Sequence, residues 1–297
     1  MQSAIMQGQS IARDSATSHY VNAARFASEG RYSMAIGEMR RAMEFLPSEP
    51  QLRVDLADLL TASGDTGGAT RELQQLADRT PPYGPAVVRL GDLRLAAGDT
   101  SGAVAHYQRL VARDTPFPPA LMRLGDIAQQ SGRRVQAIDH YREAVRADSA
   151  YVEAWLSLGS LLVIMDRYDE ALEAFTRARR AAPDDESVSS LESLAGQRKQ
   201  DYDEGTAAGK MRARIIVTAT RQDAERVRQQ VVGGADFISL CMKTSIDATA
   251  QVGGDLGFFG PGELLPQFEE AVKQLRVGQV SPIVQIPSGY AIVLRAN

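Results

Sequence analysis

A period of 34 residues runs through the first two thirds of this chain of 297 residues. It is marked by alanine at five positions: Ala35, Ala69, Ala103, Ala137 and Ala171. A glycine lies five residues before each of the first four alanines, and a bulky side chain lies four residues after all five. Columns that keep one register over several copies predict stacked helix pairs, in which each repeat packs on its neighbours.

The fifth copy carries the fullest pattern: Trp155, Leu158, Gly159, Ala171, Phe175, Ala178 and Pro183. This pattern resembles the tetratricopeptide repeat, in which small residues let paired helices pack closely. The predicted repeats cover 16–185, as 16–49, 50–83, 84–117, 118–151 and 152–185, after an N-terminal segment 1–15. Because the end of such a solenoid must be covered, 186–200 is predicted to be a capping helix.

The resemblance implies that a protein partner binds in a concave groove formed by the first helix of each repeat. One apolar column recurs on that helix: Val54, Val88, Met122 and Leu156. Charged residues flank the column: Arg89, Asp92, Arg123 and Asp126. The alternative is that the apolar column fills the core between helices and that the charges form a solvated surface. The sequence favours neither interpretation.

Composition excludes several classes of protein. The net charge of −4, with both signs mixed, argues against a nucleic-acid partner, and no apolar run approaches the length of a membrane span. The N-terminus lacks the features of a signal peptide. The sequence is thus typical of a cytoplasmic protein, or of an exported one whose leader has been removed.

Cysteine and histidine give no sign of a metal or cofactor. The single Cys241 excludes an internal disulfide, and its apolar surroundings favour a small buried side chain over a reactive thiol. His106 and His140 occupy equivalent positions in adjacent repeats. Such positions lie about 10 Å apart, which is too far for one ion, so a solvated surface is the better interpretation.

The remaining residues form a different kind of domain. Residues 201–210 are acidic and contain glycine, which predicts a linker between separable parts. Residues 211–297 follow the order β-α-α-β-α-β-β and end in two strands around a Pro-Ser-Gly turn. The predicted fold class is therefore multidomain, an all-α tetratricopeptide solenoid followed by a small α+β domain.

One glycine-rich stretch identifies this second domain. Gly253-Gly254-Asp255-Leu256-Gly257-Phe258-Phe259, followed by Pro266-x-Phe268-Glu269, resembles the parvulin family of peptidyl-prolyl isomerases over the whole of 211–297. The resemblance implies an apolar seat for the substrate proline ring, formed by Leu256, Leu264 and Phe268, with Ser288 also binding substrate. The alternative is that the three apolar side chains only fill the domain core.

The family's two histidine positions are changed in this chain. They are occupied by Ile215 and Ala291, which would make the pocket floor apolar, while Asp247 matches the family's Cys or Asp position and is the candidate catalytic residue. Rotation about an X–Pro bond breaks no covalent bond, and its barrier of roughly 18–20 kcal/mol comes from amide resonance. An apolar pocket can favour the twisted amide, so loss of the histidines leaves activity open.

Three hypotheses follow from these observations. The first is a folding or assembly factor whose repeats recruit a partner and whose second domain isomerises X–Pro bonds in proline-containing clients. The second is a pseudo-isomerase that only binds such chains as an adaptor or chaperone. The third is a scaffold in which the repeats do all the binding.

Overall fold

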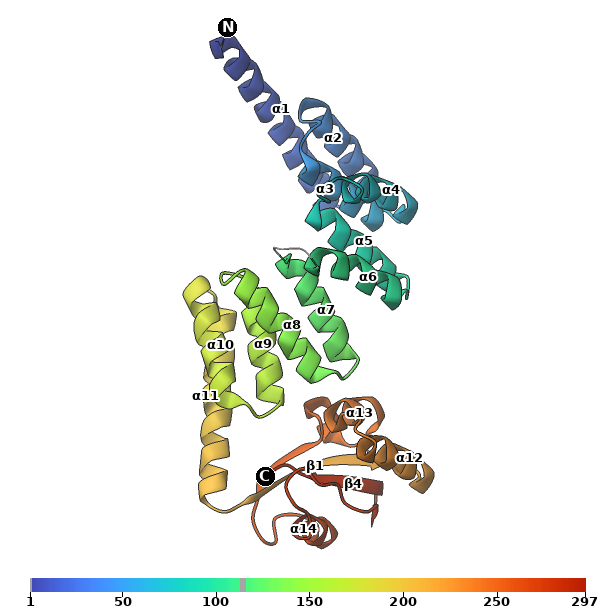
Figure 1. The fold of residues 1–297 in the computed structure, drawn as a ribbon, viewed down its shortest axis with the longest axis vertical. Coiled ribbons are helices and arrows are strands. Elements are labelled where there is room, and N and C mark those ends of the chain that lie inside the picture. Colours follow the sequence, from blue (N-terminus) through green and yellow to red (C-terminus); the bar gives the residue numbers. More distant parts are fainter. Residues whose placement is uncertain (1, 113–115) are drawn as a thin grey trace. The chain divides into compact units, whose positions relative to one another are not determined.

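The structure is a computed structural model that describes residues 2–112 and 116–297, with side chains from residue 10 onward. It divides into two compact units, Met1–Ala120 and Leu121–Asn297. Figure 1 shows helices throughout the first unit, and helices followed by a small sheet in the second. No helix in the described part of the chain has the length and apolarity needed to cross a membrane.

The first unit consists of antiparallel helix pairs. Its helices are α1 (Gln2–Ser28), α2 (Tyr32–Phe45), α3 (Pro50–Ala62), α4 (Thr66–Ala77), α5 (Gly84–Ala96) and α6 (Thr100–Val111). In the α5–α6 pair, a Cβ on Gly91 would lie 2.4 Å from the ring of Tyr107, so only glycine allows this close approach. The predicted N-terminal segment 1–15 lies within α1, which begins at Gln2.

The same packing continues in the second unit. Its repeat helices are α7 (Pro118–Gln130), which spans the boundary, α8 (Arg134–Ala147), α9 (Val152–Ile164) and α10 (Tyr168–Ala181). A Cβ on Gly125 would meet the Tyr141 ring at 2.4 Å, and one on Gly159 would meet the Phe175 ring at 2.7 Å. In these three repeats the glycine of the first helix and the aromatic residue sixteen positions later therefore form a contact between paired helices.

The structure contradicts the prediction that residues 201–210 form a linker. Helix α11 (Glu186–Ala207) continues through most of it and ends two residues before Gly209, whose φ is 65°. Gly205 is buried, and a Cβ there would lie 2.4 Å from the ring of Phe258. Tyr202 packs edge-on against the same ring, at 5.6 Å between centroids. A glycine that predicted flexibility is thus a site of close packing, and the capping helix extends well beyond residue 200.

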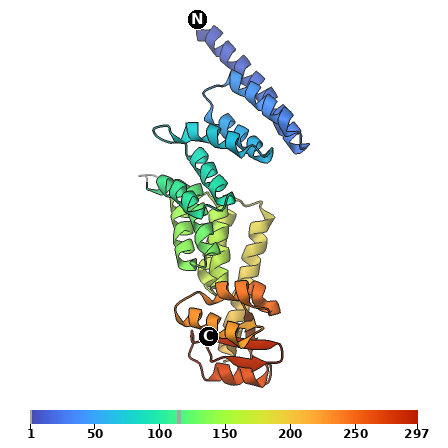
Figure 2. The same cartoon turned by 90° about the vertical axis from the view of Figure 1, so that its right-hand side faces the viewer.

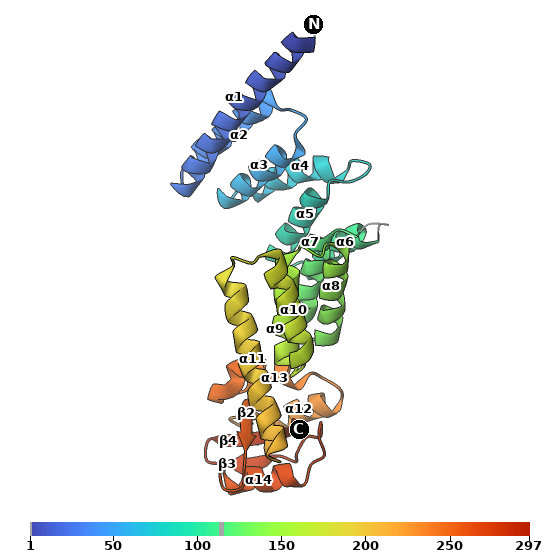
Figure 3. The same cartoon turned by 90° about the vertical axis from the view of Figure 1, so that its left-hand side faces the viewer.

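A four-stranded antiparallel sheet forms the centre of the C-terminal domain, with strand order β2-β1-β4-β3. Its strands are β1 (Met211–Thr218), β2 (Asp255–Phe259), β3 (Val284–Ile286) and β4 (Gly289–Arg295). Helices α12 (Arg221–Val232) and α13 (Phe237–Thr244) cover one face, and α14 (Pro266–Lys273) covers the other (Figures 2 and 3). The short 3₁₀ helix η1 (Ala248–Val252) leads into β2.

Strand β1 is buried on both faces, and its alternation decides what each face contains. Ile215 and Val217 point into a cluster with α14, whereas Ile216 packs with α12 and α13. Because side chains alternate along a strand, Arg212 and Arg214 fall on the side away from α14. The predicted fold class, a repeat solenoid followed by an α+β domain, is confirmed.

Candidate functional site

The three residues expected to form the proline seat come from two segments of the C-terminal domain. Leu256 lies on β2, Leu264 lies in the loop before α14, and Phe268 lies on α14 itself. All three contact one apolar cluster on the α14 face of the sheet. Leu256 and Leu264 are only partly buried, at the edge of this cluster, whereas Phe268 is 7% exposed. The two leucines therefore offer more surface to a ligand than Phe268 does.

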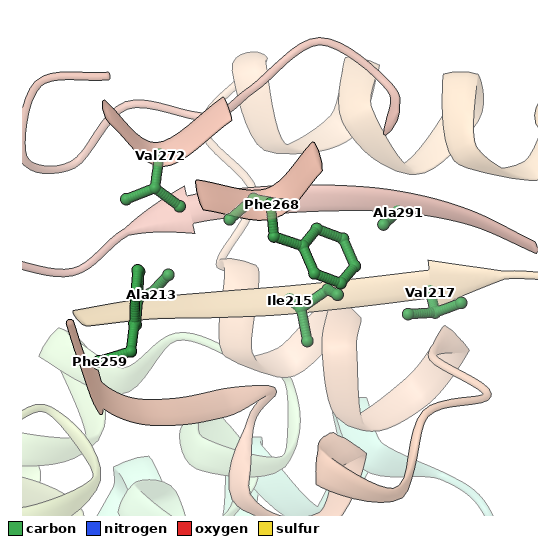
Figure 4. Packing of buried hydrophobic residues seen from close by; sticks show 8 residues of the cluster. Ala213, Ile215, Val217, Phe259, Phe268, Val272 and Ala291 are labelled. Carbon is green, nitrogen blue, oxygen red and sulfur yellow. The ribbon is translucent and has the colours of Figure 1, made fainter. Parts of the chain in front are cut away.

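The expected pocket floor differs from the structure. Ile215 and Ala291 are 2% and 0% exposed, and Figure 4 shows the Phe268 ring close to Ile215. They lie on neighbouring strands, where Val217 is the register partner of Ala291. These two residues are core residues and present no surface to a ligand. The side chains of isoleucine and alanine carry no polar group that needs contact with water. Phe268 therefore packs directly on them and buries them.

Glu269, which was not predicted as a site residue, holds the loop that carries Leu264. Glu269 is 7% exposed, and its carboxylate accepts hydrogen bonds from the backbone N–H groups of Gly262 and Leu264, at 2.7 and 3.1 Å. The bond from Leu264 is the main cause that lowers the pKa of Glu269. The signal was present in the sequence, since Glu269 belongs to the family-like Pro-x-Phe-Glu segment. Its role needed the folded loop, because its partners are backbone groups.

Asp247 lies at the start of η1, where it acts as a helix cap. Its Oδ1 accepts from the backbone N–H of Thr249 at 2.8 Å and from the Thr249 hydroxyl at 2.5 Å. The adjacent Ile246 N–H donates to the Val217 carbonyl at 2.9 Å, which anchors this loop to β1. A catalytic role for Asp247 stays a prediction, as does substrate binding by Ser288, which is exposed in the β3–β4 turn.

The glycine pair before Asp255 brings β2 against β1. Gly254 has a φ of 77°, and a Cβ there would lie 2.0 Å from the carbonyl oxygen of Ile215. The Ile215 N–H donates to the Gly254 carbonyl at 2.8 Å. Only glycine combines this φ with this approach. The glycine-rich stretch therefore fixes where β2, and with it Leu256, lies against the sheet.

The Cys241 thiol is expected to be unreactive in the folded protein. It is 0% exposed, and its thiol donates to the Ile215 carbonyl at 3.2 Å. Burial raises the pKa of this thiol to about 11, so at about pH 8 on the order of one thiol in a thousand is ionised. We predict no labelling by a thiol reagent in buffer and complete labelling in denaturant. Labelling of the native chain at the rate of a free thiol would contradict this.

The predicted groove residues of the repeats fall into two groups. Val54, Val88 and Met122 are 2%, 6% and 6% exposed, so these three lie in the core between helices and do not line a groove. The reason is the close pairing of the repeat helices, which leaves this column no path to solvent. Leu156 is partly exposed. The column thus follows the alternative of inter-helix core at three of its four positions.

The charged residues of the proposed groove form ion pairs within each unit. Arg89 pairs with Asp58 at 3.0 Å and with Asp92 at 3.5 Å. Arg123 pairs with Asp126 at 3.7 Å. All five side chains retain solvent exposure. Mutual pairing lowers the charge that they present to a partner.

In the second unit a hollow of about 320 Å³ opens on the repeat helices. Its lining is mostly uncharged and polar: Asp126, Gln129, Gln130, Tyr141, Leu156, Ser157 and Ser160. The Tyr141 hydroxyl donates to Asp126 at 2.9 Å. Two of the predicted groove residues, Asp126 and Leu156, are therefore brought together here.

Comparison with protein families agrees with both parts of the chain. The description "PPIC-type PPIASE domain" matches residues 210–297, and "Tetratricopeptide repeat" matches 54–120, 88–151 and 122–186. The chain therefore carries tetratricopeptide repeats within 54–186. Its residues 210–297 are a PPIC-type peptidyl-prolyl isomerase domain, as the parvulin resemblance predicts.

Two curated relatives match part of this chain. The foldase protein PrsA of Caldanaerobacter subterraneus subsp. tengcongensis is 42% identical over 97 residues, which are 32% of this chain and 32% of the relative. The chaperone SurA of Burkholderia orbicola is 40% identical over 77 residues, 26% of this chain and 17% of the relative. The matches thus span about a third or less of the length of these relatives.

Among solved structures, a thermophilic tetratricopeptide protein of Thermus thermophilus is similar to part of this chain. It is 21% identical, covers 61% of this chain and 98% of its own, and has a TM-score of 0.47.

Proposed function

We propose that this chain is a protein-folding factor whose C-terminal domain isomerises X–Pro bonds in client chains, while its repeats hold a protein partner. The observation that carries the first part is the convergence of Leu256, Leu264 and Phe268 on one apolar cluster, with the two leucines at its accessible edge. An apolar surface there desolvates a proline ring and favours the twisted amide, which is less polar than the planar one.

The hollow beside Leu156 supports the second part of the proposal. Its glutamine and serine side chains offer both donors and acceptors, which suit the backbone of an extended peptide or the polar face of a helix. We place a partner on this surface of the second unit. Val54, Val88 and Met122 have no part in it, because they are buried.

A second candidate is a pseudo-isomerase that binds proline-containing chains without catalysis. It is favoured by Ile215 and Ala291, which replace the family's histidines by apolar core residues. No donor stands at either position to orient the amide. Both candidates use the same apolar surface, so they differ only in whether bound peptide exchanges faster.

An exchange assay on the full chain separates these functions. Uncatalysed cis–trans exchange takes roughly 10–100 s at 25 °C, and the wild-type chain should shorten it for a short peptide with leucine before proline, followed by NMR. Leu264→Ala should weaken peptide binding about tenfold, because the exposed edge of the seat is lost. The matched control is Leu194→Ala, which makes the same truncation at a residue 49% exposed on α11 and should change nothing.

The possible results assign the function. Binding without acceleration supports the pseudo-isomerase. Neither binding nor acceleration contradicts both candidates and leaves the repeats as the functional part. Equal effects of the two leucine variants would show that the seat lies elsewhere on the domain.

A further inference from the structure

The turn between the two helices of each repeat carries an exception in the fifth repeat. In the first four repeats this position is a glycine with positive φ: Gly30, Gly64, Gly98 and Gly132, at 71°, 91°, 80° and 76°. The next position in the 34-residue series is Asp166, whose φ is 58°. In the described part of the chain it is the one residue other than glycine with positive φ. Aspartate adopts this conformation more readily than most residues but less readily than glycine.

The Asp166 carboxylate binds two arginines of the isomerase domain. Its Oδ1 lies 2.9 Å from Nη1 of Arg212, and its Oδ2 lies 3.1 Å from Nη2 of Arg214. The Tyr168 hydroxyl also donates to Oδ1, at 2.9 Å. Both arginine side chains are 5% exposed, so these are largely desolvated ion pairs.

Asp255 completes a group of two cations and two anions. Arg212 Nε donates to its Oδ1 at 3.1 Å, and a second bond joins Nη2 to Oδ2. Arg214 lies farther away, with its Nη2 3.9 Å from Oδ2. Asp255 is the residue before Leu256 and also accepts from the Gly257 N–H at 3.0 Å. The four side chains therefore connect the fifth repeat to the strand that carries part of the proline seat.

Arg214 extends this connection to the loop that precedes β2. Its Nη1 donates to the carbonyls of Val252 and Gly253, at 3.3 and 3.5 Å, and its Nη2 donates to the carbonyl of Ile164 at 3.4 Å. A single guanidinium thus joins the end of α9 to residues between Asp247 and Leu256. Asp255 contacts Arg214 only at the longer distance, so Asp166 is the carboxylate that fixes the orientation of Arg214.

The docking of the isomerase domain on the repeats has a second, independent contact. Arg134 of α8 pairs with Asp236 and donates to the Ser239 hydroxyl at 2.9 Å. Gly132 lies so close to Ser239 that a Cβ would come within 2.6 Å of its hydroxyl. A further contact is the packing of Phe258, on β2, against Gly205 and Tyr202 of α11. None of these contacts involves Asp166. The role of Asp166 is therefore more local than docking.

We propose that Asp166, a residue of the fifth repeat, is a positioning residue for the isomerase site: through Arg214 it holds the 247–257 segment, which carries Asp247 and Leu256. The proposal rests on the proposed function for its catalytic meaning, but its structural part is tested without activity. It makes a repeat residue part of the support of the isomerase site.

The test compares three variants of the full chain. Asp166→Asn keeps the shape and the turn but removes the charge, and Asp166→Gly restores the residue found in the other four turns. Asp169→Asn is the control, because Asp169 is 85% exposed and pairs at the surface with Lys199. Hydrogen exchange is followed at the segment's bonded amides, such as Gly253 N–H to the Ala250 carbonyl and Gly254 N–H to the Thr249 carbonyl.

Both Asp166 variants should speed exchange in the 247–257 segment about tenfold, since charge-assisted bonds that hold the segment are lost. Amides of β4 and of α9 should keep their wild-type rates, and Asp169→Asn should change none. If wild type accelerates X–Pro exchange, kcat should fall about tenfold in both variants while KM changes by less than about twofold.

Several outcomes overturn the inference. Wild-type exchange rates in the segment would show that Asp166 does not hold it. Faster exchange throughout the second unit, β4 and α9 included, would reduce Asp166 to a general stabilising contact. If the wild type does not accelerate X–Pro exchange, the proposed isomerase function is wrong. Hydrogen exchange at the amides of the 247–257 segment then still tests whether Asp166 positions that segment.

Discussion

Replacing Phe268 by alanine should destabilise the C-terminal domain by about 3–5 kcal/mol, the usual cost of removing a core phenylalanine. The residue is 7% exposed and packs with Ile215, Val217 and Ala291 in the cluster under α14. Truncation leaves a cavity that these neighbours are unable to fill, because the sheet fixes their backbone positions. Peptide binding should be lost together with stability.

The single cysteine provides the measurement. Cys241 is buried in the opposite layer of the same domain, so a thiol reagent reports its unfolding as denaturant is added, while the repeats contribute no signal. Leu265→Ala is the control: the residue precedes α14 and is 46% exposed, so its loss should cost less than about 0.5 kcal/mol. A Phe268→Ala chain as stable as this control would mean that the residue lies outside the core. Because Leu264 is only partly buried, Leu264→Ala tests the proline seat with less effect on stability than Phe268→Ala.

Arg212→Met should also lower the free energy of unfolding by about 3–5 kcal/mol, because it leaves the buried carboxylate of Asp255 without its closest cation. Asp255 is 10% exposed at its side chain and has its two close charged contacts with Arg212. The nearest other cation is Arg214, at 3.9 Å. Denaturant unfolding followed by Cys241 labelling measures the loss. Arg226→Met is the control, because Arg226 is 64% exposed and pairs at the surface with Asp223.

The pH dependence of this variant has a defined sign. Burial alone raises the pKa of Asp255, but the Arg212 hydrogen bond and the charges of Arg212 and Arg214 outweigh it, so the wild-type pKa is lowered. The wild type therefore gains stability from Asp255 above the ordinary carboxyl pKa of about 4, and loses it as pH falls through the lowered value. Without Arg212 burial prevails and the carboxyl protonates more readily.

The deficit of Arg212→Met should consequently be largest near neutral pH and shrink toward about pH 4. The double variant with Asp255→Asn should recover part of the loss, because no buried charge is left without a partner. A deficit that is constant with pH, or a double variant no better than the single one, would contradict the electrostatic explanation and point to lost packing of the Arg212 stem.

Much of the fold was predictable because its determinants are local in sequence. A glycine and an aromatic residue sixteen positions apart, such as Gly91 and Tyr107, meet within one helix pair, so a regular period is enough to reveal them. The glycine-rich stretch at Gly254 is equally local, since its φ and its approach to Ile215 exclude other residues. Both patterns express backbone geometry, which residue type constrains strongly.

The candidate site was less predictable, because burial depends on what packs above a residue. Val54, Val88 and Met122 fit both a groove and a core by spacing, and their burial was decided by the partner helices. Ile215 and Ala291 occupy positions that are polar in the family. Their exposure was decided by Phe268, which closes over apolar neighbours.

The sequence by itself determined the repeat period, the change of domain after the repeats and the family of the second domain, because each is encoded by neighbouring residues. Only the tertiary structure decided that Gly205 is a packing position and that Asp166 reaches Arg212 and Arg214. Sequence shows that Asp166 breaks the glycine series, but not where its carboxylate points. That direction depends on contacts between residues almost fifty positions apart, which no local pattern records.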